Sequence, residues 1–193
     1  MTTYAPTTEL EAVNVMLSVI GEAPVSSLDI SGFSDVAIAK SILEEVSREV
    51  QSEQWSCNTE NEYELVPDNS GYISVPSNVL KLDIIEDQSY KYSPVVRGSR
   101  LYDKKNKTFV FPETLKFDIV WYLPFTDLPE TIRRYITIAA ARKFQKRFYS
   151  SDTLDGFTQE DEYRARANAL SSDEYEADYN MMANYSVHNI LLR

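Results

Sequence analysis

Residues 9–55 read ELEAVNVMLSVIGEAPVSSLDISGFSDVAIAKSILEEVSREVQSEQW, and their pattern of apolar residues predicts how the N-terminal part of the chain folds. Its apolar residues recur at steps of three and four, which places them on one side of a helix. The first segment carries Leu10, Val13, Leu17 and Ile20, and the second carries Val36, Ala39, Leu43, Val46 and Val50. The spacing predicts two amphipathic helices joined by a loop, each packed against other helices.

Local signals predict where these two helices begin and end. Thr8 and Glu11 have the spacing of a capping box at the start of the first helix. Gly21 suits the left-handed position that ends a helix, and Pro24 prevents continuation. Ser34 is the predicted cap of the second helix.

Alternating apolar residues replace the helical period between residues 60 and 124. The clearest strand is 115–121, and 80–84 is a second half-buried strand. Further short strands are predicted at 63–65, 72–75, 90–96, 100–102 and 108–111. Turn residues recur about every ten positions, so this segment is predicted to be an antiparallel β module of undetermined strand order.

Two further helices are predicted after the β module. Asp127 is the expected cap of the first of them, and Tyr163, Ala167 and Leu170 mark the buried side of the second. The first helix also carries six cations, Arg133, Arg134, Arg142, Lys143, Lys146 and Arg147. We interpret them either as a face that contacts an acidic partner or as a solvated face whose long side chains cover the core.

The predicted fold class is α+β, a bundle of about four helices, two N-terminal and two C-terminal, with an inserted antiparallel β module. The helical part covers residues 8–57 and 127–183, the β insertion covers 60–124, and a C-terminal tail covers 184–193. The whole is expected to form one domain, with a separate β lobe as the alternative. The tail ends in apolar residues, Val187, Ile190, Leu191 and Leu192. Such an end is predicted to dock on a neighbouring molecule or to pack back on its own helices.

The formal net charge of −11 is unevenly distributed along the 193 residues. Residues 1–60 carry −8, residues 61–128 carry −2, residues 129–149 carry +5 and residues 150–193 carry −6. An acidic chain is poorly suited to tight nucleic-acid binding, which requires cations to neutralise phosphates. It is compatible with a wall past which DNA moves without adhering.

Enzyme chemistry is disfavoured by the residue inventory. A single histidine, His188, and a single cysteine, Cys57, cannot assemble a Ser-His-Asp triad or a histidine-rich metal site within one chain. No phosphate-binding glycine loop is present, so we expect no cofactor, no metal and no catalytic residue. No apolar run is long enough to span a membrane. The alternative hypothesis is a carbohydrate-active enzyme or glycan-binding tail protein, in which two of the thirty acids form a pair and the aromatic residues stack on sugar rings.

Several stretches resemble the tail tubular protein A family of short-tailed bacteriophages. The similar segments are Ala12-Val13-Asn14, Ile20-Gly21-Glu22, Pro24-Val25-Ser26, Asp35-Val36-Ala37 and residues 51–55, together with AARKFQKRFYS and QEDEYRARANAL near the C-terminus. The resemblance covers most of the chain and is weakest in the middle.

This resemblance implies a head-to-tail adaptor of the virion tail, assembled in the host cytoplasm. Its expected partners are the portal protein, the nozzle protein, genomic DNA that passes without specific binding, and further copies of itself in a ring of about twelve. The helical part and the tail would engage the portal, and the β module would face the nozzle. We expect the six cations of residues 129–149 to pair with Glu160, Asp161 and Glu162 of a neighbouring copy.

Overall fold

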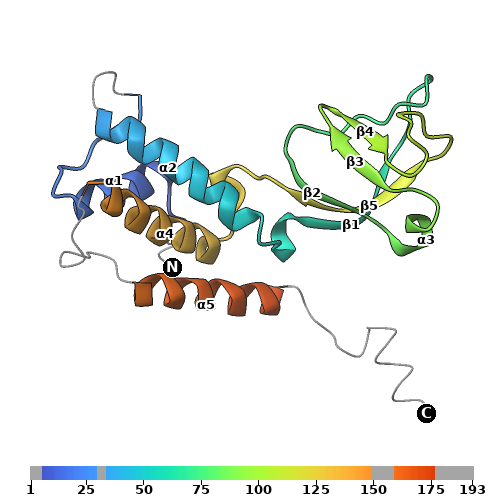
Figure 1. Ribbon diagram of the computed structural model, residues 1–193. Coiled ribbons are helices and arrows are strands. Elements are labelled where there is room, and N and C mark those ends of the chain that lie inside the picture. Colours follow the sequence, from blue (N-terminus) through green and yellow to red (C-terminus); the bar gives the residue numbers. More distant parts are fainter. Residues whose placement is uncertain (1–5, 30–33, 149–158, 177–193) are drawn as a thin grey trace, which may run out of the picture. The chain divides into compact units, whose positions relative to one another are not determined.

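The computed structural model describes residues 6–29, 34–148 and 159–176, and confirms the predicted α+β class (Figure 1). The chain divides into two compact units. One combines Met1–Leu43 with Pro129–Arg193 and is helical in its described parts, and the other is the continuous segment Glu44–Leu128.

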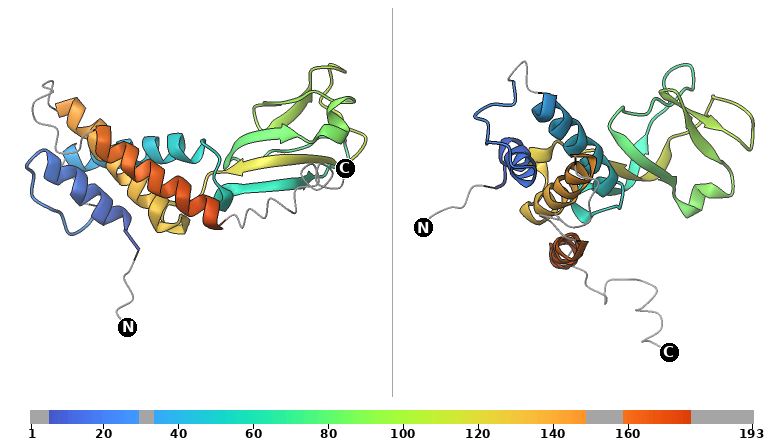
Figure 2. Two further views of the ribbon diagram at one scale, coloured as in Figure 1. Left: turned by 90° about the horizontal axis from the view of Figure 1, so that it is seen from below. Right: turned by 60° about the vertical axis from the view of Figure 1, so that its left-hand side comes forward.

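The helical unit is built from α1 (Glu9–Val19), most of α2 (Ser34–Gln51), α4 (Glu130–Phe148) and α5 (Gln159–Glu176). Helix α4 packs against both α1 and α5, and Figure 2 shows α5 lying alongside α4. The end of α2 belongs to the second unit. The predicted pairs of N-terminal and C-terminal helices are therefore present.

The predicted starting signals of α1 are confirmed by its hydrogen bonds. Thr8 Oγ1 accepts from the Glu11 backbone N–H at 3.2 Å, and the Glu11 carboxylate accepts from the Thr8 N–H at 2.8 Å. The Thr8 backbone N–H and then its hydroxyl lower the pKa of Glu11. Gly21 has a φ of +81°, the left-handed conformation expected there. The predicted stripe of α2 is also confirmed, since all five of its members are buried: Val36, Ala39, Leu43, Val46 and Val50.

Helix α4 differs from its prediction in the residue at which it begins and in the burial of its sides. It begins at Glu130, and Asp127 lies in the preceding 3-10 turn, where its carboxylate accepts from the Thr126 hydroxyl. Buried residues occur on almost every side of α4, so its cations do not share one solvated face. Arg133 itself is only 9% exposed.

The predicted buried side of α5 is wrong. Tyr163 is 64% exposed and Leu170 38% exposed, and Ala167 is exposed as well. The buried residues of α5 are Ala165 and Ala169 instead. Both sets have helical spacing, and small side chains allow α5 to approach α4 closely. The periodicity alone could not decide between them.

The second unit is antiparallel, as predicted, and contains two sheets. In the larger sheet, β5 (Leu115–Trp121) lies between β1 (Thr59–Leu65) and β2 (Val79–Ile84), so the clearest predicted strand is the central one. The smaller sheet is a hairpin of β3 (Pro94–Arg97) and β4 (Arg100–Asp103). Residues 72–75 and 108–111 form isolated bridges instead of the predicted strands. A short helix that was not predicted, α3 (Glu86–Ser89), precedes the hairpin.

The core of this unit lies between the two sheets. It consists of eight buried side chains from both sheets and their connections: Leu65, Ile73, Tyr92, Leu101, Phe111, Leu115, Phe117 and Ile119. Gly71 has a φ of +80°, and a Cβ built on it would meet Val110 Cγ1 at 2.6 Å. A glycine is therefore required at this turn for both backbone conformation and space.

Two buried amides join the end of α2 to β5 and the segment after it. Gln51 donates to the Leu123 carbonyl at 3.0 Å and accepts from the Leu123 N–H at 2.7 Å. Asn58 accepts from the Trp55 N–H at 3.0 Å and donates to the carbonyls of Gln51 and Trp121 at 3.0 and 2.8 Å. These side chains satisfy backbone groups where the chain changes from helix to strand.

Candidate interaction surfaces

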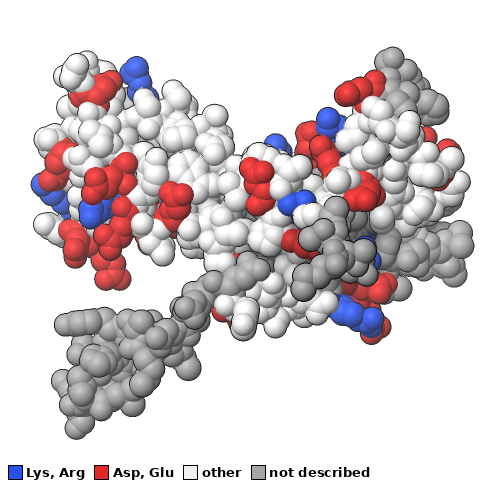
Figure 3. Space-filling view, turned by 180° about the vertical axis from the view of Figure 1, so that it is seen from behind, with Lys and Arg blue, Asp and Glu red and all other residues white. Residues whose placement is uncertain are grey.

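The described residues form no cluster of His, Cys, Asp or Glu that could hold a metal ion. None of the described helices is both long and apolar enough to cross a membrane. Acidic side chains gather in several groups on the side of the molecule that Figure 3 shows, and basic ones are fewer there. The features that remain as functional candidates are surfaces on each of the two units.

The cations of α4 occupy several environments. Arg133 donates from Nη1 to the Thr7 carbonyl at 3.1 Å, and Glu130 accepts from the Thr7 N–H and hydroxyl at 2.7 and 2.6 Å. These bonds fasten the segment before α1 to the first turns of α4. Arg134, Lys146 and Arg147 are exposed, and Lys143 is half-buried.

Among the described residues, one ion pair joins a cation of α4 to an acid of α5 in the same chain, whereas the pairing predicted between neighbouring copies stays a prediction. Arg142 Nη1 forms an ion pair with the Glu162 carboxylate, and the two side chains are 16% and 31% exposed. Glu160 instead pairs with Arg164 one turn along α5, at 3.2 Å, and both of these side chains are largely exposed. Arg142 and Glu162 therefore help hold α5 on α4, together with Ala165 and Ala169.

The outer side of α5 carries a stripe of residues that we call the α5 stripe, made of Tyr163, Ala167 and Leu170. These residues are four and three positions apart, so they lie on one side of the helix. Tyr175, near the end of the helix, is 89% exposed. Large apolar side chains on a helix that already packs by another side are typical of a surface that meets a partner. The predicted tail contacts, Val187, Ile190, Leu191 and Leu192, lie outside the described residues.

The β3–β4 hairpin carries a basic and aromatic surface that the sequence analysis missed. We call it the basic hairpin; its exposed cations are Arg97, Arg100, Lys104, Lys105 and Lys107. The Arg97 guanidinium lies 3.7 Å from the centroid of the Tyr102 ring, and that ring makes an edge contact with Phe109 at 4.8 Å. Arg100 lies 4.6 Å from the Tyr72 ring centroid. The rings hold both arginines in place while leaving their charges at the surface.

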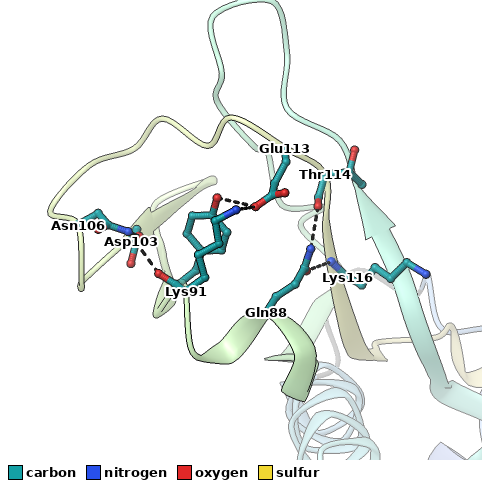
Figure 4. A network of polar contacts seen from close by, with 8 residues as sticks. Gln88, Lys91, Asp103, Asn106, Glu113, Thr114 and Lys116 are labelled. Atoms are coloured by element: carbon teal, nitrogen blue, oxygen red, sulfur yellow. Dashed lines mark hydrogen bonds and ion pairs between the residues drawn. The ribbon is translucent and has the colours of Figure 1, made fainter.

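A polar network beside α3 supports the hairpin, and Figure 4 shows its members. Gln88 donates to the Thr114 carbonyl at 3.1 Å and accepts from the Lys116 N–H at 2.9 Å. Lys91 forms an ion pair with Glu113, whose carboxylate also accepts from the Tyr92 hydroxyl at 2.7 Å. The hydrogen bond with Glu113 raises the pKa of Lys91, and the bonds from Lys91 and then Tyr92 lower the pKa of Glu113.

Asp103 closes the hairpin from the inside. It is fully buried, and its carboxylate accepts from the backbone N–H groups of Ser93 and Lys105, each at 2.9 Å, and from the Asn106 side chain. Burial raises the pKa of this carboxyl, but the hydrogen bonds outweigh burial, so the pKa lies below its ordinary value. The turn that carries three of the lysines is thereby fixed to the body of the hairpin.

The outer edge of the larger sheet is acidic. Glu60, Glu62 and Glu64 of β1 are exposed, and we call them the acidic edge. Lys116 lies 3.3 Å from Glu62 and 3.7 Å from Glu64, and its hydrogen bond with Glu62 raises its pKa. One cation is therefore shared between two of the three carboxylates.

Comparison with known proteins indicates the same family as the resemblance seen in the sequence. The family model described as tail tubular protein matches residues 10–179, which include parts of both units. The chain is also 35% identical over 123 residues to tail tubular protein A of Klebsiella phage KP34. That alignment covers 63% of this chain and 63% of the relative, so the chain spans less than two thirds of that relative's length. The chain belongs to the tail tubular protein family, whose members are structural proteins of bacteriophage tails.

Proposed function

We propose that this protein is a head-to-tail adaptor, a ring between the portal and the nozzle that lines the DNA channel. The observation that carries the proposal is the family match, which extends over residues 10–179. A ring adaptor needs surfaces for its neighbours, for the portal above it and for the nozzle below it. The α5 stripe, the basic hairpin and the acidic edge are three such surfaces within the two units.

The α5 stripe is the proposed portal contact in the helical unit. Tyr163 and Leu170 are exposed although their helix already has a packed side, so a partner can cover them without unfolding the bundle. The exposed cations Arg134, Lys146 and Arg147 and the tail residues 187–192 are proposed to add to this contact. The β unit is left to the nozzle and to neighbouring copies.

The proposed mechanism is mechanical and electrostatic. A chain with a net charge of −11 repels DNA, so an acidic channel wall lets the genome pass without gripping it. No bond-breaking step and no cofactor enter this mechanism. We also propose that the protein assembles into the virion tail in the host cytoplasm.

Light scattering with and without the cognate portal tests this function. We expect the mixture to form one particle with about twelve adaptor copies per portal ring. The double variant Tyr163→Ser/Leu170→Ser should weaken this binding, and Ala167→Ser, on the same side of α5, serves as its mild control. A chain that stays separate from the portal at high concentration and low salt would refute the adaptor function.

A further inference from the structure

We propose that the basic hairpin of one copy binds the acidic edge of a second copy, so that oppositely charged sides of the β unit join neighbours head to tail. The inference rests on the proposed ring and assigns one of its copy-to-copy contacts. It concerns only the β unit, residues 44–128.

The two surfaces belong to different sides of this unit. The order of the larger sheet is β1-β5-β2, so the acidic edge on β1 is separated from β2 by the central strand. The basic hairpin lies on the β2 side, because Val96, Gly98 and Ser99 at its tip form a groove of about 370 Å³ with residues of β2. Figure 1 shows β3 and β4 above the larger sheet and β1 at its lower side. A contact between different sides of identical molecules is heterologous, the type that closes rings.

The charges of the two surfaces are complementary. The basic hairpin has five exposed cations, and its only acid, Asp103, is buried and occupied by hydrogen bonds. The acidic edge has three exposed carboxylates, of which two share Lys116. In a strongly acidic chain, a second copy offers the hairpin a surface of the opposite sign.

Apolar groups flank the charges on both sides. Val96, Phe109 and Val110 of the hairpin region are 48%, 38% and 47% exposed. Beside the acidic edge, Tyr63 is 37% exposed and Val66 67% exposed. Aromatic residues and arginine are enriched in protein interfaces, and Arg97 is already ordered on Tyr102, so little side-chain freedom is lost on binding.

Side chains, and not backbone pairing, are expected to make the contact. The register of β1 is irregular between Glu60 and Tyr63, and Glu62 there has a φ of +54°. Strand β3 begins with Pro94, which has no N–H to donate. Bulges and prolines protect sheet edges from indiscriminate strand addition. Ionic contacts would therefore set the pairing and make it sensitive to salt.

Cross-linking of the full chain tests the contact without the portal. Concentrated protein, mixed from unlabelled and ¹⁵N-labelled chains in low salt, is treated with a carbodiimide that joins amines to carboxylates at zero length. We expect mixed-isotope cross-links between Lys104, Lys105 or Lys107 and the carboxylates of the acidic edge. The same links should appear in the portal assembly. Their absence from both samples, or cross-links that map to other surfaces, would overturn the inference.

Exchanging the charges of the two surfaces provides a second test of the contact. Arg97→Glu/Arg100→Glu and Glu60→Lys/Glu64→Lys should each lower the cross-linked fraction roughly tenfold. Their combination in one chain should recover part of that loss, because the exchanged side chains again have opposite signs while Lys104, Lys105 and Lys107 keep their charge. Lys40→Glu/Arg164→Glu changes the net charge as much as the first variant but alters only the helical unit, and it should have no effect. If the cross-linked fraction of the combined variant shows no recovery over the two single-surface variants, complementarity is refuted.

The outcomes separate this inference from the adaptor function and from DNA binding. A wild-type chain that ignores the portal but forms the expected cross-links refutes the adaptor function and supports the contact. A chain that joins the portal without these cross-links supports the adaptor function and refutes the contact. If the hairpin instead binds short duplex DNA, and Arg97→Glu/Arg100→Glu abolishes that binding while no cross-links form, the partner is nucleic acid and the inference fails.

Discussion

Replacing Asn58 with Ala should destabilise the β unit more than any exposed substitution nearby. Asn58 is 2% exposed, and its side chain makes three hydrogen bonds, to backbone groups of Trp55, Gln51 and Trp121. Alanine leaves all three of these backbone groups without that partner. At about 1 kcal/mol for each lost bond, the free energy of unfolding should fall by about 3 kcal/mol. For a chain of this length, that corresponds to a fall in Tm of roughly 6–12 °C.

Urea unfolding followed by tryptophan fluorescence measures this effect directly. The chain has two tryptophans, Trp55 and Trp121, and both donate or accept a backbone bond with Asn58. Asn61→Ala is the matched control, since Asn61 is exposed three residues away, and its effect should stay within about 0.5 kcal/mol. Asn58→Asp keeps the volume and the acceptor but loses both donors. If this variant is as stable as wild type, the hydrogen bonds do not supply the stability and the reasoning is refuted.

Three further predictions concern other parts of the structure. Asp103→Asn should lower stability by about 1–3 kcal/mol at pH 7. The pKa of Asp103 in the folded state lies below the unfolded value of about 3.9, so its carboxylate stabilises the fold above that pH. The difference in stability between wild type and Asp103→Asn should therefore vanish as the pH falls through the folded pKa. Urea midpoints of the two proteins that differ equally at pH 7 and at pH 3 would contradict this. Gly98→Ala should lower the free energy of unfolding by roughly 1–2 kcal/mol, and Gly71→Ala should lower it more. Both glycines have a positive φ, but of the two only Gly71 has a neighbour with which a Cβ would collide. Thermal melts that rank the two variants in the opposite order would disprove this. Ala169→Leu should lower stability by about 1–3 kcal/mol, because the larger side chain overpacks against α4. Ala167→Leu should leave stability nearly unchanged, because Ala167 is exposed. Hydrogen exchange in α5 that does not distinguish the two variants would refute the assigned packing.

The elements that the sequence predicted well depend on local interactions. The capping box of Thr8 and Glu11 and the turn at Gly21 involve neighbours along the chain, so residue type and spacing are sufficient. The stripe of α2 was predictable because its apolar residues form a single series. Strand β5 was predictable because it is central and its alternation is long.

The elements that were missed depend on contacts between distant segments. In α5, the Tyr163 series and the Ala165 series have equally regular spacing, and only the close approach of α4 selects the small residues. The stacking of Arg97 on Tyr102 depends on the β3–β4 register, which pairs Arg97 with Arg100 and was not predicted. The amides of Gln51 and Asn58 read as ordinary polar residues until β5 supplies their partners. For the same reason, the sequence showed the lysines of residues 104–107 and the nearby Arg97 and Arg100, but not that they form one surface with Tyr72 and Tyr102.

The discontinuity of the helical unit has a consequence for the order of events during synthesis. Residues 44–128 form a continuous segment and can fold as soon as they leave the ribosome, whereas α1 must wait for α4, against which it packs. Closing a chain over such a distance costs entropy, and a β unit that is already compact shortens the effective loop. We therefore expect the nascent chain to display a finished β unit while the apolar side of α1 still lacks α4. The α5 stripe is presented on a finished bundle only after both α4 and α5 have been translated, so contacts that use it are delayed until then.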